Sequence, residues 1–340
     1  MPNNPTKILL STTLIGGILI SISSNSWLGA WMGLEINLMS FIPLMSSQEN
    51  IFTTEASLKY FIIQALASSA LLFLVVMEVL NDQNLTMGKN IHEYVVMTPL
   101  LLKMGAAPVH WWFPSVMEGL SWENCLLMMT VQKAAPMMLA SYLMSINYLI
   151  LTIVVLSVMV GSIGGMNQTS LRKILTYSSI NHTGWMLVAL MGGSNLWVMY
   201  FMVYSLLTAA VTMTTKLHNI SFINQTMSMS GKTMTKFILF TTLLSLGGLP
   251  PFLGFLPKWA VIQTMIMNNM SSIMTIMVIT SLATLYYYLR MCYSSFITTY
   301  NETKWGPQMF KVNKTTTYSV VLSSMSMMGL IVCTVLINIS

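Results

Sequence analysis

The chain has 340 residues, of which 55% are hydrophobic and only 7% are charged, and its formal net charge is +6. Soluble domains carry about 25% charged residues, so this composition excludes an ordinary soluble enzyme. The basic residues are scattered between apolar runs and form no dense patch, so no nucleic-acid partner is expected. The composition predicts an all-α polytopic membrane protein.

Apolar runs of roughly the 20 residues that a bilayer requires follow one another along the chain. They predict about eleven transmembrane helices. The expected spans, in chain order, lie near residues 8–22, 27–45, 58–80, 92–117, 123–143, 148–166, 171–191, 196–216, 236–268, 272–298 and 318–337.

The fourth span contains the sequence LLLKMGAAPVHWWFP, which runs from Leu100 to Pro114. Lys103 in the middle of a span costs roughly 2.5–3.5 kcal/mol on insertion scales. Pro108 has no N–H and clashes with the preceding turn, so the helix is expected to break near residues 103–108. A broken backbone at bilayer depth persists only where protein or a water-filled cavity satisfies its freed groups. A charge beside a break indicates an ion path, and the alternative is a kinked helix with a snorkelling lysine.

The ninth span has the same character, in the sequence LSLGGLPPFLGFLPKWA from Leu244 to Ala260. A second break is expected near residues 247–258, with Lys258 at its end. The alternative is that Lys258 snorkels towards an interface. Gly/Pro-interrupted segments at corresponding places in two halves indicate a transporter site. Because the breaks are five spans apart, we expect two inverted five-helix repeats, residues 1–146 and 147–298. Residues 299–340 would form a loop and a C-terminal transmembrane helix.

Loop charges agree with an odd number of spans. The loops on one face of the membrane would carry nine basic residues, whereas those on the opposite face would carry essentially only Lys89. The nine are Lys7, Arg172, Lys173, Lys216, Lys232, Lys236, Lys304, Lys311 and Lys314. The positive-inside rule then places the N-terminus on the matrix or cytoplasmic side and the C-terminus across the membrane.

Several ionisable residues lie near the centres of predicted spans. Glu35 is in the second span, and Lys103 and Lys133 are in the fourth and fifth. Lysine loses its proton more readily than arginine, as a proton carrier must, and a nearby carboxylate would modulate its proton affinity. Glu35 and Lys133 could instead form structural pairs. His110 and His182 also lie within spans, where each is either a proton relay or a buried structural histidine.

Motifs of soluble enzymes are absent from the sequence, which contains no GxGxxG before a helix, no P-loop, no HExxH and no GxSxG. Cys125, Cys292 and Cys333 are far apart and form no CxxC pair, so neither a disulfide framework nor an iron–sulfur site is expected.

Five blocks carry a family resemblance: SNSWLGAWMGLEINLMSFIPL, TEASLKYFIIQALAS, LLLKMGAAPVHWWFP, GGMNQTSLRKILTYSSINHTGWM and SLGGLPPFLGFLPKW. They resemble the chain 2 family of mitochondrial NADH:ubiquinone oxidoreductase (respiratory complex I), in an insect-like version. This family is similar to Mrp-type cation/proton antiporter subunits. The resemblance covers nearly the whole chain and weakens near residues 81–90, 218–235 and 301–317. The 34 methionines also resemble those of a chain encoded in a mitochondrial genome.

The resemblance implies a core membrane subunit that conducts protons, coupled to NADH oxidation and ubiquinone reduction in other subunits. It implies eleven helices, with Glu35, Lys103 and Lys133 in a first half-channel and Lys258 in a second. No cofactor would be bound by this chain, because NADH, FMN, the iron–sulfur clusters and ubiquinone belong to the wider complex.

The implied partners are other membrane and accessory subunits of complex I, including neighbouring antiporter-like subunits, and phospholipids. The implied location is the mitochondrial inner membrane, with the N-terminus in the matrix and the C-terminus in the intermembrane space. Two alternatives remain open at this point: a free-standing cation/proton antiporter, and a purely structural membrane spacer.

Overall fold

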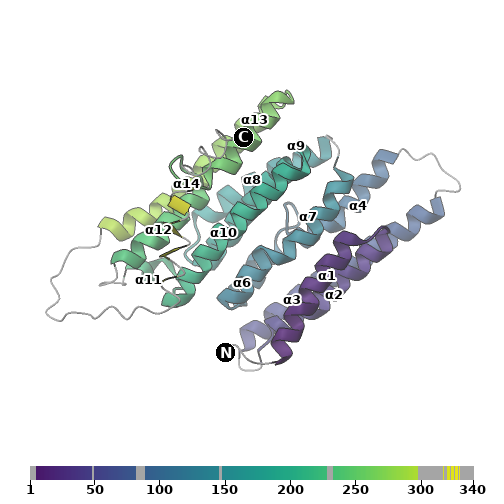
Figure 1. Cartoon of the computed structure of the whole chain (residues 1–340), viewed down its shortest axis with the longest axis horizontal. Helices are drawn as coiled ribbons and strands as arrows, with labels where there is room; N and C mark the ends of the chain where they lie inside the picture. The colour runs from purple at the N-terminus through teal and green to yellow at the C-terminus, as the bar shows by residue number, and fades with distance from the viewer. Residues whose placement is uncertain are drawn as a thin grey trace. The chain divides into compact units, whose positions relative to one another are not determined.

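The computed structural model describes residues 5–47, 50–81, 89–144, 148–227 and 233–297, with isolated positions between 317 and 329. These residues form α-helices and connecting turns, with a single β-bridge between Ser170 and Phe222 among them (Figure 1). The helices are α1 (Pro5–Ser23), α2 (Trp27–Met45), α3 (Ile51–Asn81), α4 (Lys89–Met104), α5 (Trp112–Gly119), α6 (Trp122–Met129), α7 (Val131–Leu143), α8 (Tyr148–Met166), α9 (Leu171–Gly192), α10 (Ser194–His218), α11 (Ile223–Met227), α12 (Thr233–Gly247), α13 (Phe255–Met267) and α14 (Ser271–Ile297).

Six of the described helices, α1, α2, α3, α8, α10 and α14, are long and apolar enough to cross a membrane. Shorter apolar segments at Tyr94–Met104 and Lys236–Gly247 belong to the helices that lead into the two breaks. The protein is therefore an all-α, multi-pass membrane protein. The count of about eleven spans stays a prediction, and only isolated positions of the last predicted span belong to the described residues.

Contacts divide the chain into two compact units, Met1–Ile153 and Val154–Ser340, which we call the first and the second unit. The first unit contains α1 to α7, and the second contains most of α8 and the helices that follow it. Within each unit the helices run side by side (Figure 1). The inverted repeat with boundaries at 146 and 298 stays a prediction.

Small residues allow the first two helices to approach closely. A Cβ atom on Gly17 would lie 2.9 Å from the backbone nitrogen of Asn37, and one on Gly33 would lie 2.5 Å from that of Ser21. Lipid tails are as apolar as leucine, so helices in a bilayer associate through such close packing rather than through the hydrophobic effect. α1 and α2 therefore form a tightly packed pair of helices, and Glu35 lies on α2.

Two helices differ from the predicted spans. The third helix begins at Ile51 rather than near residue 58, because the Thr53 side chain orders its first turn by donating to the Asn50 carbonyl oxygen at 2.7 Å. The fifth span is not continuous, since α6 and α7 are separated at Thr130. The Thr130 hydroxyl donates to the carbonyl oxygen of Leu126 at 2.7 Å, a side-chain bond that often bends helices.

Candidate functional site

The first helix break occupies residues 105–111, between α4 and α5, where the glycine and proline pattern predicts it. Gly105 ends α4 with a φ of 70°, a conformation that strains any residue with a Cβ atom. Its N–H donates to the carbonyl oxygen of Leu102 and that of Ala106 donates to Leu101, both at 3.1 Å. This is a Schellman motif, so the end of α4 is an ordered structure rather than a frayed one.

Side chains of neighbouring helices satisfy carbonyls that the break leaves available. Gln64 Nε2, on α3, donates to the carbonyl oxygen of Lys103 at 3.4 Å. Trp112 Nε1, on α5, donates to that of Leu102 at 3.2 Å. The break is therefore satisfied by protein groups, as bilayer depth requires. Lys103 itself is buried in the last turn of α4, where the helix dipole favours a cation.

Glu35, on α2, lies within electrostatic range of Lys103. Its Oε1 accepts a hydrogen bond from the Ser68 hydroxyl at 3.0 Å, and Ser68 is held in turn by Trp31 Nε1, which donates to its carbonyl oxygen at 3.1 Å. Its Oε2 is buried without a hydrogen-bond partner among the described residues. The structure thus brings the predicted acid and the predicted lysine together, with one carboxylate oxygen still able to accept a proton or a hydrogen bond.

Lys133, on α7, is 2% exposed, and its Nζ lies 4.8 Å from the ring centre of Phe113, a favourable cation–π geometry. Next to it, Gln132 Nε2 donates to Asn37 Oδ1 at 3.0 Å, and the Tyr60 hydroxyl donates to Gln132 Oε1 at 3.2 Å. This buried network joins α2, α3 and α7. The network was not predicted from the sequence, although Gln132 directly precedes Lys133 and Asn37 lies two residues after Glu35.

The second break occupies residues 248–254, between α12 and α13, again where the sequence predicts it. Gly248 adopts a φ of 84°, and Lys258 packs against it. The Lys258 Nζ donates to the carbonyl oxygen of Gly247 at 2.8 Å, so the ammonium group caps the negative end of α12. Lys258 is buried and turned inward, which argues against snorkelling to an interface. A Cβ atom on Gly254 would collide with the carbonyl oxygen of Ser245, so the tight fold of the break requires glycine there.

His182, on α9, lies beside a small cavity of the second unit. Its Nδ1 is 2.9 Å from the hydroxyl oxygen of Tyr200, and its ring centre is 5.0 Å from that of Tyr204. The cavity measures about 10 Å³, roughly the space that one water molecule needs. Its lining consists of His182, Tyr200, Val203, Tyr204, Leu207, Leu246, Gly254 and Pro257. Because Pro257 precedes Lys258, the cavity lies next to the helical turn that carries this lysine.

His110 lies in the first break itself rather than on a helix. Its Nδ1 is 3.2 Å from the carbonyl oxygen of Pro108, and its ring stacks against Trp111 with ring centres 5.1 Å apart. These contacts give His110 a part in ordering the break. Its role as a relay stays a prediction.

In each unit the side chain of a buried lysine thus lies at the C-terminal end of the helix that leads into an ordered break. Lys103 lies in the last turn of α4, and Lys258 donates to the last residue of α12. A buried amine that can gain and lose a proton, next to polar groups that stabilise its charge, is suited to proton transfer rather than to substrate chemistry. This combination of fold and site defines a class of membrane proteins, the ion-translocating proteins with discontinuous helices.

Comparison with known proteins identifies the family. Residues 24–284 match the family described as NADH:quinone oxidoreductase/Mrp antiporter, TM, and residues 285–337 match that described as NADH dehydrogenase subunit 2 C-terminus. The NADH-ubiquinone oxidoreductase chain 2 of Anopheles gambiae is 50% identical over 321 residues, which cover 94% of each chain. That of Bos taurus is 41% identical over 333 residues, again 94% of each. The chain belongs to the NADH-ubiquinone oxidoreductase chain 2 family.

Solved structures share the fold at lower sequence identity. A chain of respiratory complex I from Thermus thermophilus aligns with a TM-score of 0.83 at 23% identity, over 97% of this chain and 79% of that one. A chain of the Mrp complex from Dietzia sp. aligns with a TM-score of 0.73 at 17% identity, over 83% of this chain and 59% of that one. The architecture is therefore common to proteins of both complexes.

Proposed function

We propose that this chain is the antiporter-like membrane subunit of respiratory complex I that conducts protons across the mitochondrial inner membrane. Membership of the chain 2 family supports the assignment to the complex. The observation that carries the transport role is the burial of Lys103 and Lys258 beside the two helix breaks. NADH oxidation and ubiquinone reduction occur in other subunits, and this chain itself binds no NADH, FMN, iron–sulfur cluster or ubiquinone.

Proton transfer would follow from the electrostatics of each break. Glu35 stabilises the protonated form of Lys103, and loss of that influence releases the proton towards Lys133. In the second unit, the protonated form of Lys258 is stabilised by the carbonyl oxygen of Gly247. Moving one charge across the membrane costs about 2.3 kcal/mol per 100 mV, so the driving energy must come from the redox reaction elsewhere in the complex.

The proposed topology has eleven spans, arranged as two inverted five-helix repeats and a C-terminal helix. The N-terminus lies in the matrix and the C-terminus in the intermembrane space. The spacing of the two breaks and the segregation of basic loops support this arrangement. The partners would be the other membrane and accessory subunits of complex I, including neighbouring antiporter-like subunits, and phospholipids.

The test is Lys103→Met in the intact complex, reconstituted in liposomes and supplied with NADH. A proton carrier predicts loss of coupled proton pumping with assembly retained, because methionine keeps the apolar volume and removes the titratable amine. Lys59→Met is the matched control, since Lys59 lies exposed on α3. Normal pumping by an assembled Lys103→Met complex would instead support a structural spacer.

A further inference from the structure

Charge is distributed very unevenly between the two units of the chain. The first unit contains five basic and eight acidic residues, a formal charge of −3. The second contains ten basic residues and one acidic residue, Glu302, a formal charge of +9, and the two units together give the +6 of the whole chain. Residues 154–297 contain no aspartate or glutamate. The carboxylates of the second unit therefore cannot balance its positive charge, which favours an anionic partner.

The exposed part of this charge lies at one end of the second unit. Of the six basic residues among its described residues, Lys236 and Lys258 are buried. The other four are in the first turn of α9, in the last turn of α10 and near the end of α14. We call them the basic cluster, which consists of Arg172, Lys173, Lys216 and Arg290.

Hydrogen bonds between loops and helices hold the members of the basic cluster near one another. Nη1 of Arg290, on α14, donates to the carbonyl oxygen of Met166, the last residue of α8, at 3.2 Å. The backbone N–H of Leu171, the first residue of α9, donates to the carbonyl oxygen of Ser221 at 2.9 Å. Ser221 follows the end of α10 by three residues. The ends of α8, α10 and α14 and the start of α9 therefore meet at the same end of the unit.

An exposed apolar stripe on α14 leads to the basic cluster. Its four members are 42% to 70% exposed and follow one another at intervals of three or four residues, so they share one face of the helix. They are Leu282, Tyr286, Leu289 and Tyr293. Arg290 directly follows one of them and lies one helical turn from two others, so the stripe and the cation are adjacent.

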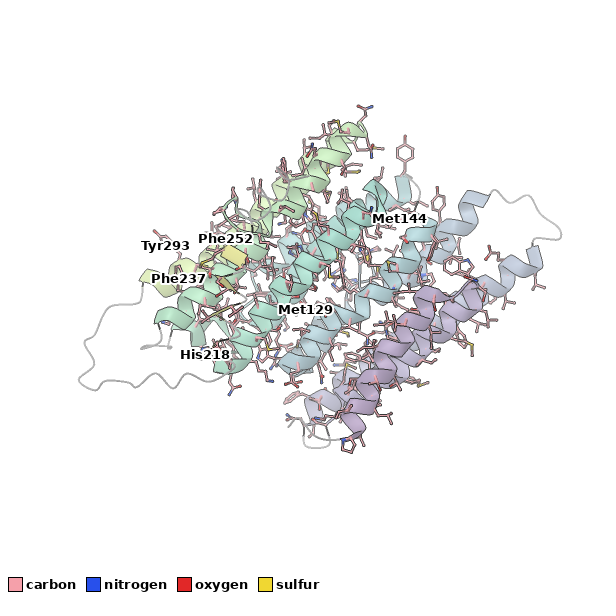
Figure 2. The ribbon with its side chains drawn as sticks, viewed as in Figure 1. Met129, Met144, His218, Phe237, Phe252 and Tyr293 are labelled. Atoms are coloured by element: carbon pink, nitrogen blue, oxygen red, sulfur yellow. The ribbon has the colours of Figure 1, made fainter. Side chains whose placement is uncertain are left out.

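Further aromatic residues are exposed at this end of the unit. Figure 2 labels Tyr293 and Phe237 there, together with His218 at the end of α10. Phe237 is 48% exposed, and Phe222, in the loop after α10, is 49% exposed. Aromatic side chains beside cations are typical of the region where lipid headgroups meet the acyl chains.

We propose that the basic cluster binds the headgroup phosphate of an anionic phospholipid, whose acyl chain lies along the apolar stripe of α14. A guanidinium group has five N–H donors, and the bond to Met166 uses one of those of Arg290, so others remain for phosphate oxygens. Basic pockets between transmembrane helices are known to bind anionic headgroups. A free phosphate ion would match the cations but not the stripe. The site goes beyond the proposed function and does not depend on proton transfer.

The experiment places the intact complex in phosphatidylcholine nanodiscs that contain a trace of photoactivatable phosphatidylglycerol. After illumination, mass spectrometry maps and quantifies the labelled peptides. The site predicts labelling of residues 282–293 that falls several-fold in Arg290→Gln and in Lys173→Gln, because glutamine removes the charge and stays polar. Lys59→Gln is the matched control, since Lys59 is an exposed lysine of the first unit, four residues after Glu55, and its loss should leave this labelling unchanged.

Equal labelling by phosphatidylglycerol and by a phosphatidylcholine with the same photoactivatable group would overturn the site, and so would full labelling in both glutamine variants. Displacement of the lipid by inorganic phosphate would indicate a site for the free ion instead. Carbodiimide cross-links from Lys173 to a carboxylate of another subunit, without lipid labelling, would show a protein partner and also overturn it. If the variants fail to assemble, the preference of the unmodified complex for phosphatidylglycerol decides. Proton pumping by Lys103→Met tests the proposed function separately, so either proposal can fail alone.

Discussion

At the scale of the residue, Lys258 combines an observed structural role with the proton-transfer role that we propose for it. Its ammonium group satisfies the carbonyl oxygen at the end of α12 and packs on Gly248. The hydrogen bond needs only a cation, whereas proton transfer needs a cation that can lose its proton. Arginine meets the first requirement and fails the second, because it stays charged at any physiological pH.

The substitution Lys258→Arg separates these tasks. The complex is expected to assemble, since the positive charge at the end of α12 is retained, but its NADH-driven proton pumping is expected to be lost. Proton uptake into liposomes, measured with a pH-sensitive dye, checks this. Lys216→Arg, at an exposed position of α10, serves as control and should pump normally. Full pumping by Lys258→Arg would remove this lysine from the proton path.

Ser68 provides a second test at this scale. Its hydroxyl is the donor that holds Glu35 Oε1, and hydrogen bonds to charged groups contribute about 1.5–3 kcal/mol. Ser68→Ala is expected to lower coupled NADH oxidation by roughly tenfold, because 1.4 kcal/mol corresponds to a factor of ten when the bond is needed in the rate-limiting step. Ser69→Ala removes an exposed neighbouring hydroxyl and should have no effect. Equal rates for the two variants would show that Ser68 does not position the carboxylate.

At the scale of the element, the close approach of α1 and α2 determines where Glu35 lies. Gly17 faces the backbone of α2, whereas a Cβ atom on the adjacent Gly16 would meet no atom within 4 Å. The two glycines lie on the same helix, but only Gly17 packs against α2. Substitutions at the two positions can therefore be compared directly.

Gly17→Ala is expected to destabilise the packing of α1 against α2 by about 1–3 kcal/mol, the usual cost of overpacking. Gly16→Ala should be neutral or slightly stabilising, because alanine is the better helix former. Thermal unfolding of the purified complex, together with the yield of assembled complex, measures both effects. A similar loss for the two variants would mean that the close approach of the helices is not what the glycine provides.

Glycines with a specific structural role also occur at the two helix breaks. Gly105 and Gly248 end their helices with φ angles of 70° and 84°, and neighbouring side chains satisfy the carbonyls that remain. A break in a membrane helix is thus stabilised by specific donors. The lysines are among the cations that the ends of these half-helices favour.

At the scale of the whole molecule, the proposed function places proton-transfer groups in this chain and the source of energy in other subunits. A subunit of complex I therefore differs in its behaviour from a free-standing cation/proton antiporter, which would share the broken helices. The distinction is testable on the isolated chain.

We expect the purified chain, reconstituted alone, to show no sodium- or potassium-driven proton exchange, since its proton movement depends on the redox subunits. A fluorescent pH indicator inside liposomes, with an imposed cation gradient, provides the measurement. The Mrp-type antiporter complex is a suitable positive control. Exchange by the chain alone, abolished by Lys103→Met, would favour the antiporter alternative over a subunit of complex I.

The sequence by itself determined the fold class, the two breaks and the lysines beside them. Each of these follows from local chemistry: apolar runs of membrane length, prolines that lack an N–H, glycines that tolerate positive φ, and charged residues, which are energetically costly inside a membrane span. The interruption at Thr130 was not predicted, because threonines are common in apolar spans and most leave the helix unbroken: Thr208 and Thr212 bond back to the preceding turn in the same way, yet α10 is continuous.

Only the tertiary structure decided which polar groups meet. Glu35 and Ser68 are 33 residues apart, Gln132 and Asn37 are 95 apart, and the cap that Lys258 provides for α12 spans the second break. No local pattern contains these pairings, because they depend on how helices rotate and pack against one another. The physical reason is that periodicity fixes the buried face of one helix, while its partner across the bundle is chosen by the packing of small residues and by the hydrogen bonds that satisfy each break.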